Sequence, residues 1–144
     1  MTFIYFDSEH AIQVHDEIIA KSGGIQGILN IGLLESVIEH VQNDMYYPEI
    51  EHKITHLLFS INKNHAFQDG NKRSSVALSA YFMELNGFDF CVNKFFREIE
   101  NIAVDVADNR VNKDLLFEII SSILYEDDYS EGLKLKLIHA KTQN

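Results

Sequence analysis

Apolar residues recur along most of the chain at the three- and four-residue spacing of amphipathic helices. The first stripe, which includes Ile12, Ile18 and Ile19, predicts a helix over residues 8–21 that Gly23-Gly24 ends. Either Asp7 or Ser8 can cap the start of this helix. Four similar patterns predict helices over residues 31–42, 49–64, 94–108 and 113–125, with Asn93 and Asn112 as caps for the last two.

One further helix differs from the others because it is apolar nearly all round. It begins within residues 65–73 and runs to about Asn86, where Gly87 stops it. A helix without a polar face is buried on all sides. Phe88-Asp89-Phe90 is too short to be more than a strand fragment. The pattern therefore predicts an all-α helical bundle in which this helix is central and buried.

The acidic run Glu126-Asp127-Asp128 interrupts the helical pattern near the end of the chain. Beyond it, residues 133–137 alternate between Leu and Lys, and we expect a short C-terminal helix there. The chain has 144 residues, of which 46% are hydrophobic, and this suits a single core. We expect one domain over residues 1–125, with residues 126–144 as a tail packed on it.

The composition of the chain limits the kinds of partner that the protein can bind. The formal net charge is −10, which repels nucleic-acid phosphates and argues against direct binding to DNA or RNA. No apolar run approaches the roughly 18 residues of a membrane span. The first residues lack the basic region of a signal peptide, and Cys91 is the only cysteine. These features predict a cytoplasmic protein without a membrane partner.

Residues 65–73, which we call the signature segment, concentrate groups suited to nucleotide chemistry. They read His65-Ala66-Phe67-Gln68-Asp69-Gly70-Asn71-Lys72-Arg73 and lead into the central helix. Gly70 lets the backbone approach a ligand, and the free N–H groups of a helix start attract an anion. Lys72 and Arg73 add positive charge, and Arg can hold phosphate oxygens with two parallel hydrogen bonds.

The same segment carries a candidate base and a candidate metal ligand. A histidine can accept a proton from an attacking hydroxyl, which makes His65 the candidate base. The Asp69 carboxylate is a hard oxygen ligand of the kind that Mg²⁺ prefers. Phe67 is expected to anchor the loop in the core. Of the other six histidines, His52 and His56 have metal-ligand spacing but no third ligand, so we expect no zinc site there.

This segment resembles the signature of the Fic/Doc superfamily, H-x-F-x-D/E-G/A-N-x-R. The Asn71-Lys72-Arg73 ending is similar to the Doc, or death-on-curing, branch, whereas AMP-transferring Fic proteins have Gly at the middle position. Flanking segments agree with the Doc layout and extend the resemblance to about Tyr125: His15-Asp16, residues 22–25, residues 32–35, Tyr47-Pro48 and Lys63-Asn64.

The resemblance implies a toxin of a toxin–antitoxin pair that uses ATP and Mg²⁺. His65 would be the general base, and Asp69 would hold Mg²⁺ and align that base. Gly70, Asn71 and Arg73 would cradle the nucleotide phosphates. Lys72 would fill the room that a diphosphate uses in Fic proteins. The nucleotide would then lie reversed, and the protein would act as a kinase on a threonine of a target such as elongation factor Tu and so block translation.

Two other functions stay open at this stage. Gly70 is typical of the AMP-transferring branch, whereas Doc proteins have Ala there, so AMP transfer is the alternative enzymatic activity. An inactive module that only binds nucleotide or antitoxin is the third. Residues 122–126 approach the inhibitory pattern S/T-x-x-x-E-G/N, but Asp127 stands where Gly or Asn is required. We therefore expect that a separate antitoxin with a disordered inhibitory segment inhibits the protein.

Overall fold

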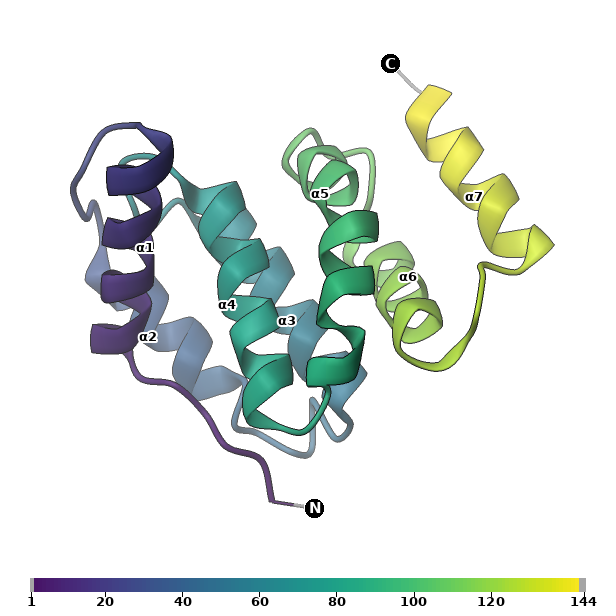
Figure 1. The fold of residues 1–144 in the computed structure, drawn as a ribbon, viewed down its shortest axis with the longest axis horizontal. Coiled ribbons are helices and arrows are strands. Elements are labelled where there is room, and N and C mark those ends of the chain that lie inside the picture. Colours follow the sequence, from purple (N-terminus) through teal and green to yellow (C-terminus); the bar gives the residue numbers. More distant parts are fainter. Residues whose placement is uncertain (1, 143–144) are drawn as a thin grey trace.

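The computed structural model describes residues 2–142, and these form seven α-helices and one short 3-10 helix (Figure 1). In chain order they are α1 (Ser8–Ser22), α2 (Ile31–His40), α3 (Ile50–Asn64), α4 (Asn71–Leu85), η1 (Asp89–Cys91), α5 (Val92–Ala107), α6 (Lys113–Tyr125) and α7 (Glu131–Thr142). Residues 2–142 contain no strand, only an isolated antiparallel bridge between Ile28 and Phe67. The predicted all-α class is confirmed.

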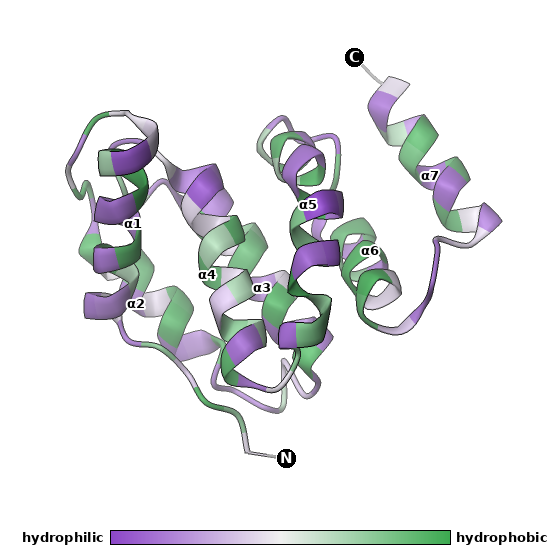
Figure 2. Ribbon diagram, in the orientation of Figure 1, coloured by the Kyte–Doolittle hydropathy of each residue, from purple (hydrophilic) through white to green (hydrophobic). Residues whose placement is uncertain are grey.

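Helices α3 and α4 pack against each other at the centre of the bundle (Figure 1). Helix α3 also contacts α2, α5 and α6, while α4 contacts α1 and α5. Figure 2 shows hydrophilic and hydrophobic residues alternating along the ribbons of the outer helices, as in α1 and α7. The buried positions of α4 include Leu78, Phe82 and Met83, together with small residues such as Ser75 and Ser79 that let neighbouring helices approach.

The core also contains a fully buried cation. Lys53 of α3 donates hydrogen bonds to the Val41 carbonyl at 2.9 Å and to Asp44 Oδ1 at 2.7 Å. Its ammonium lies 4.9 Å from the centre of the Phe3 ring. A buried charge is tolerated only when it is paired and hydrogen-bonded in this way. Lys53 thereby ties the loop after α2 to the first turns of α3.

The structure corrects two local predictions. Residues 89–91 form the 3-10 helix η1, so Phe88-Asp89-Phe90 is not a strand fragment. Helix α5 starts at Val92, with Cys91 at its cap position, so Asn93 lies inside the helix. Both differences have one cause: η1 runs directly into α5 and leaves no extended residue between them. Asn112 does cap α6, where its side chain accepts the Leu115 N–H at 2.8 Å.

The predicted C-terminal helix is present and longer than the alternating pattern suggested. Helix α7 lies at the edge of the molecule and contacts α6 (Figure 1). Lys136 of α7 pairs with Glu118 of α6 at 2.8 Å, and Lys141 pairs with Asp105 of α5 at 2.5 Å. No helix within residues 2–142 combines the length and apolar character needed to cross a bilayer.

Candidate active site

The signature segment forms a tight loop between the two central helices. His65 terminates α3 in the left-handed conformation, with φ 53° and ψ 47°, and its side chain is exposed. Gly70, with φ 76°, takes the cap position of α4. Only glycine adopts that conformation without a steric penalty. The loop thus turns twice within a few residues and leaves the α4 N-terminus open.

Two buried side chains hold this loop in shape. Phe67 is fully buried, and its ring stacks on the His15 imidazole with the ring centres 3.8 Å apart. The Asn71 amide accepts the Phe67 N–H at 3.1 Å and donates to the Phe67 carbonyl at 3.0 Å. His15 Nε2 lies 2.6 Å from the Asp69 carbonyl oxygen. The side chain of Asn71 therefore faces inward and clasps the loop, and only its backbone N–H is available to a ligand.

A glycine-rich segment, residues 23–30, runs alongside the loop. The Leu29 N–H donates to the Ala66 carbonyl at 2.8 Å, and the Gln68 N–H donates to the Gly27 carbonyl at 3.0 Å. Gly24, with φ 125°, is the point of closest approach: a Cβ there would lie 2.8 Å from Asp69 Oδ2. Glycine is required at this position because no side chain fits.

Asp69 is held as an ionised carboxylate. Its Oδ2 accepts the Ile25 N–H at 3.1 Å and its Oδ1 accepts the Gly70 N–H at 2.8 Å. These two hydrogen bonds, followed by the nearby Arg73 charge, hold the pKa of the Asp69 carboxyl below its ordinary value. Arg73 Nη2 lies 4.0 Å from Asp69 Oδ1, and Arg73 Nη1 donates to the Gly23 carbonyl at 2.9 Å.

These groups line a cleft of about 350 Å³, which we call the signature cleft. Its lining residues are Asn62, His65, Gln68, Asp69, Gly70, Asn71, Lys72, Arg73 and Ala107. The first N–H of α4 with a backbone acceptor is that of Ser74, which donates to the Gly70 carbonyl at 2.9 Å. The three preceding N–H groups donate no hydrogen bond within residues 2–142 and lie at the positive end of the helix dipole. The arrangement suits an anion such as a phosphate.

The structure brings His65, Asp69, Gly70, Lys72 and Arg73 together at this cleft. Sequence reasoning missed two supporting groups. From the sequence, His15 was only a flanking residue of the family resemblance, but it is fully buried beneath the loop and stacks on Phe67. Gly24 was expected only to end a helix. The spacing of Gly23, Gly24 and Gly27 was the one available signal that this segment passes close to another.

Comparisons with known proteins agree with this geometry. A sequence model of the Fic/DOC family matches residues 5–83. The chain is 32% identical over 89 residues to "Toxin Doc" from Mycolicibacterium smegmatis, covering 59% of this chain and 68% of the relative. It is also 32% identical over 87 residues to "Protein kinase doc" from Escherichia phage P1, covering 58% of this chain and 68% of the relative. On these matches, the chain belongs to the Fic/DOC family.

Proposed function

We propose that this protein is a Doc-type toxin that transfers the γ-phosphoryl group of ATP to a hydroxyl group of a protein. The proposal rests on the signature cleft and on the relatives, one named as a toxin and one as a protein kinase. The observation that carries it is Lys72, whose side chain lines the cleft directly beside the open N–H groups of α4. A lysine there occupies volume and adds charge where a glycine would leave room for a diphosphate.

His65 acts as the general base. It lies at the exposed rim of the cleft, and its imidazole has no hydrogen-bond partner within residues 2–142. It takes the proton from the target hydroxyl as the new oxygen–phosphorus bond forms. The bond between the γ-phosphorus and the bridging oxygen breaks, and ADP leaves. General-base catalysis of this kind contributes roughly a hundredfold to ten-thousandfold in rate.

Arg73 and the α4 N-terminus bind the phosphates. The Arg73 guanidinium is about two-fifths exposed and is oriented by the Gly23 carbonyl, so its remaining N–H groups are available to phosphate oxygens. The N–H groups of Asn71 and Lys72 add dipolar stabilisation. Phosphoryl transfer depends mainly on positioning and charge neutralisation, and this short segment supplies both.

The site also fits the Mg²⁺ ion that ATP carries. Mg²⁺ is commonly held by one or two carboxylates together with phosphate oxygens and water. Asp69 provides an ionised, partly exposed carboxylate at the cleft, and its outward lone pairs are not all used by the Ile25 and Gly70 N–H groups. When bound, the ion would neutralise charge on the phosphates. Asp69 is the residue that would hold it.

AMP transfer is the competing activity, and one observation favours it. Gly70 lies in a tight space at the start of α4, where an added Cβ would meet Ile19 Cδ1 at 3.1 Å, so the fold disfavours a side chain there. Glycine at this position is the Fic-type choice. We weigh Lys72 above it because Lys72 changes both the volume and the charge of the anion site.

A separate antitoxin protein is the expected regulator. A groove of about 380 Å³ between α1, α4 and α5 is lined mainly by apolar side chains such as Val76, Ala77 and Phe96. It shares Lys72 and Arg73 with the signature cleft. An antitoxin helix in this groove would cover both cations. The chain's acidic character, which includes Glu100 of this groove, suits basic residues on the parts of that segment that lie away from Lys72 and Arg73. A cytoplasmic location is part of the same proposal.

The intact mass of elongation factor Tu tests the function. Purified target is incubated with ATP, Mg²⁺ and either the wild type or the His65→Ala variant. The proposal predicts the mass increase of one phosphoryl group, which is lost with His65→Ala. The mass increase of one adenylyl group would establish AMP transfer instead, and no increase with any translation factor would remove the kinase proposal.

A further inference from the structure

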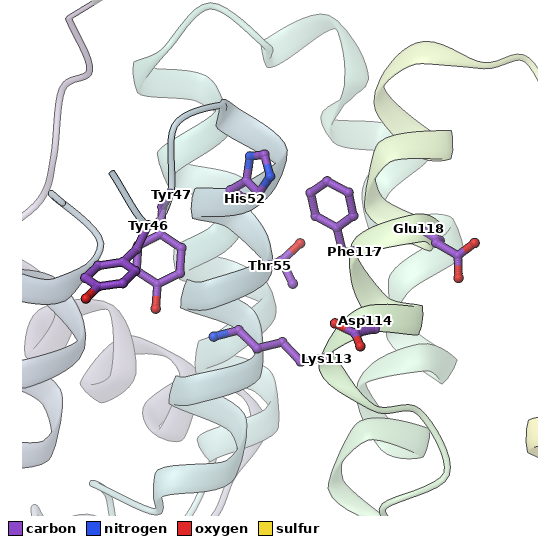
Figure 3. Close-up of a pocket in the computed structure, with 8 residues that line it drawn as sticks. All are labelled: Tyr46, Tyr47, His52, Thr55, Lys113, Asp114, Phe117 and Glu118. Atoms are coloured by element: carbon purple, nitrogen blue, oxygen red, sulfur yellow. The ribbon is translucent and has the colours of Figure 1, made fainter. Parts of the chain in front are cut away.

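A second hollow, of about 390 Å³, lies between the loop of residues 43–49 and helix α6 (Figure 3). We call it the aromatic pocket. Figure 3 shows the two tyrosines of the loop on one side, Phe117 of α6 on the other and α3 between them. Its lining residues are Tyr46, Tyr47, His52, Thr55, Lys113, Asp114, Phe117 and Glu118.

The aromatic pocket is separate from the signature cleft. Thr55 of the pocket lies within α3, and His65 of the cleft directly follows the end of this helix, ten residues later, which corresponds to about 15 Å of helix length. The two hollows share no lining residue. Helix α6 also lies outside the residues 5–83 that the family model matches. A ligand in the aromatic pocket therefore leaves the catalytic groups accessible.

Contacts within the protein hold the aromatic rings of the pocket in position. The Tyr47 ring stacks on the buried His56 imidazole with the ring centres 4.3 Å apart, and the His52 ring lies 4.6 Å from the Phe117 ring. Lys113 extends across the floor toward the tyrosines (Figure 3), with Nζ 5.3 Å from the centre of the Tyr47 ring. A surface whose aromatic rings are already positioned loses little conformational entropy on binding.

The rim of the pocket exposes apolar surface that the fold does not use. Met45 is 93% exposed and Tyr46 is 76% exposed, although both are large and follow each other in the chain. The loop that carries them is ordered by Asn43, whose Oδ1 accepts the Met45 N–H at 3.0 Å. Tyr, Phe and Met are enriched at protein interfaces, and Tyr is frequent among the residues that dominate binding energy.

The charges around the pocket identify the partner's chemistry. The Lys113 ammonium points inward, with Nζ 3.4 Å from His56 Nδ1 and 5.3 Å from the centre of the Tyr47 ring, so its charge lies at the floor of the pocket and not at the rim. Asp114, at the outer edge, has no cationic partner within residues 2–142. The chain as a whole carries a formal charge of −10. Potentials across interfaces are complementary, so the partner should be basic beside its apolar anchor.

We propose that the aromatic pocket is a docking site for a segment of another protein in which an aromatic side chain is flanked by Lys or Arg. The aromatic side chain enters between Tyr47 on one side and the contacting rings of His52 and Phe117 on the other. The flanking cation faces Asp114. This docking site does not depend on the proposed transfer reaction, and binding at it holds a partner on the toxin while the signature cleft stays open.

A short synthetic peptide with one Trp between two Lys residues is the probe. The protein contains no Trp, so the Trp fluorescence reports only the environment of the peptide. Titration with protein should shift the Trp emission to shorter wavelength along a saturable curve that weakens with added salt. A peptide with Glu in place of both Lys residues is the matched control, and it should bind at least about tenfold more weakly.

Variants of the protein test whether the peptide binds at the aromatic pocket. Tyr46→Ala and Phe117→Ala should each weaken binding about tenfold or more, and Tyr46 is so exposed that its loss leaves the fold intact. Phe90→Ala is the matched control, because Phe90 is 74% exposed but does not line the pocket. Asp114→Lys should reverse the preference between the Lys and Glu peptides. His65→Ala should leave peptide binding unchanged.

Three results would overturn the proposal: titration without saturation, equal affinity for the Lys and Glu peptides, or Tyr46→Ala and Phe117→Ala variants that bind like the wild type. Sedimentation adds a further test. The proposal expects the same oligomeric state for the wild type and Tyr46→Ala. A dimer that Tyr46→Ala dissociates would assign the pocket to a second copy of the chain instead.

Discussion

The buried His56 imidazole should make the stability of this protein fall in mild acid. Burial, together with the neighbouring Lys113 charge, lowers the pKa of His56 from 6.5 to about 4. Tyr47 stacks on the ring and His40 lies 6.5 Å away, so the groups facing His56 provide no negative charge that would favour its protonated form. Protonating His56 in the folded state is therefore unfavourable.

The sign and size of the His56 contribution to the free energy of unfolding follow from proton linkage. Between pH 6.5 and about 4 the unfolded chain binds a proton at this position that the folded chain does not bind, so the free energy of unfolding rises with pH. The contribution is complete above pH 6.5 and is lost as the pH falls toward 4. A lowering of about 2.5 pH units corresponds to about 3 kcal/mol.

Urea unfolding at a series of pH values measures this contribution, with His56→Gln as the test variant and His40→Gln as its control. His40 is exposed on the same face, so its replacement should leave the pH dependence nearly unchanged. The free energy of unfolding of the wild type, minus that of His56→Gln, should fall by about 3 kcal/mol from about pH 7.5 to about pH 4. A difference that stays constant across this range would refute the reasoning, because His56 would then titrate alike in both states.

Three further outcomes are expected. Gly24→Ala should abolish target modification because its Cβ would meet Asp69 Oδ2 at 2.8 Å, whereas Gly23→Ala, also at a positive φ but with nothing within 4 Å of the added Cβ, should keep most activity in the same assay. Asn71→Ala removes both hydrogen bonds to the Phe67 backbone and should lower the free energy of unfolding by about 2 kcal/mol, measured by urea titration. Arg73→Ala should weaken ATP binding at least about tenfold by calorimetry without a change in thermal unfolding temperature beyond a few degrees, and unchanged affinity would count against the phosphate cradle.

Helix positions could be predicted from the sequence wherever a local signal marks the boundary. Asp7 and Asn112 are caps whose side chains accept N–H groups three residues later, and the observed α1 and α6 start where they indicate. Asn93 failed as a cap because the turn before it, η1, is itself helical. Aromatic residues such as Phe90 favour strands only when a neighbouring strand is available, and none lies within residues 2–142.

The candidate site likewise has one part that the sequence predicts and another part that it does not. His65, Asp69, Lys72 and Arg73 are close in the chain, so a helix start after a short loop suffices to bring them together. The supports of the loop come from far away in sequence. His15 reaches the Asp69 carbonyl across 54 residues, and Ile25 reaches the Asp69 carboxylate across 44. Spacing cannot reveal such contacts, because they depend on how α1 packs beside α4.

The same limit explains the inward-facing Asn71. Its amide bonds to the backbone of Phe67, whose ring is buried in the core against the His15 ring. From the sequence alone, the side chain and the backbone N–H of Asn71 are equally plausible phosphate ligands. The folded loop separates them and leaves the backbone group for the ligand.

Label transfer from ATP to elongation factor Tu decides whether the signature cleft is the site of a kinase. Parallel reactions carry the label on the γ-phosphate or on the α-phosphate, with wild type, His65→Ala, and His40→Ala as the control for loss of a surface histidine. We expect transfer from γ-labelled ATP alone, a rate at least about a hundredfold lower for His65→Ala, and an unchanged rate for His40→Ala. Transfer of the α-label, or full activity of His65→Ala, would contradict the assignment of this cleft to a kinase with His65 as its base.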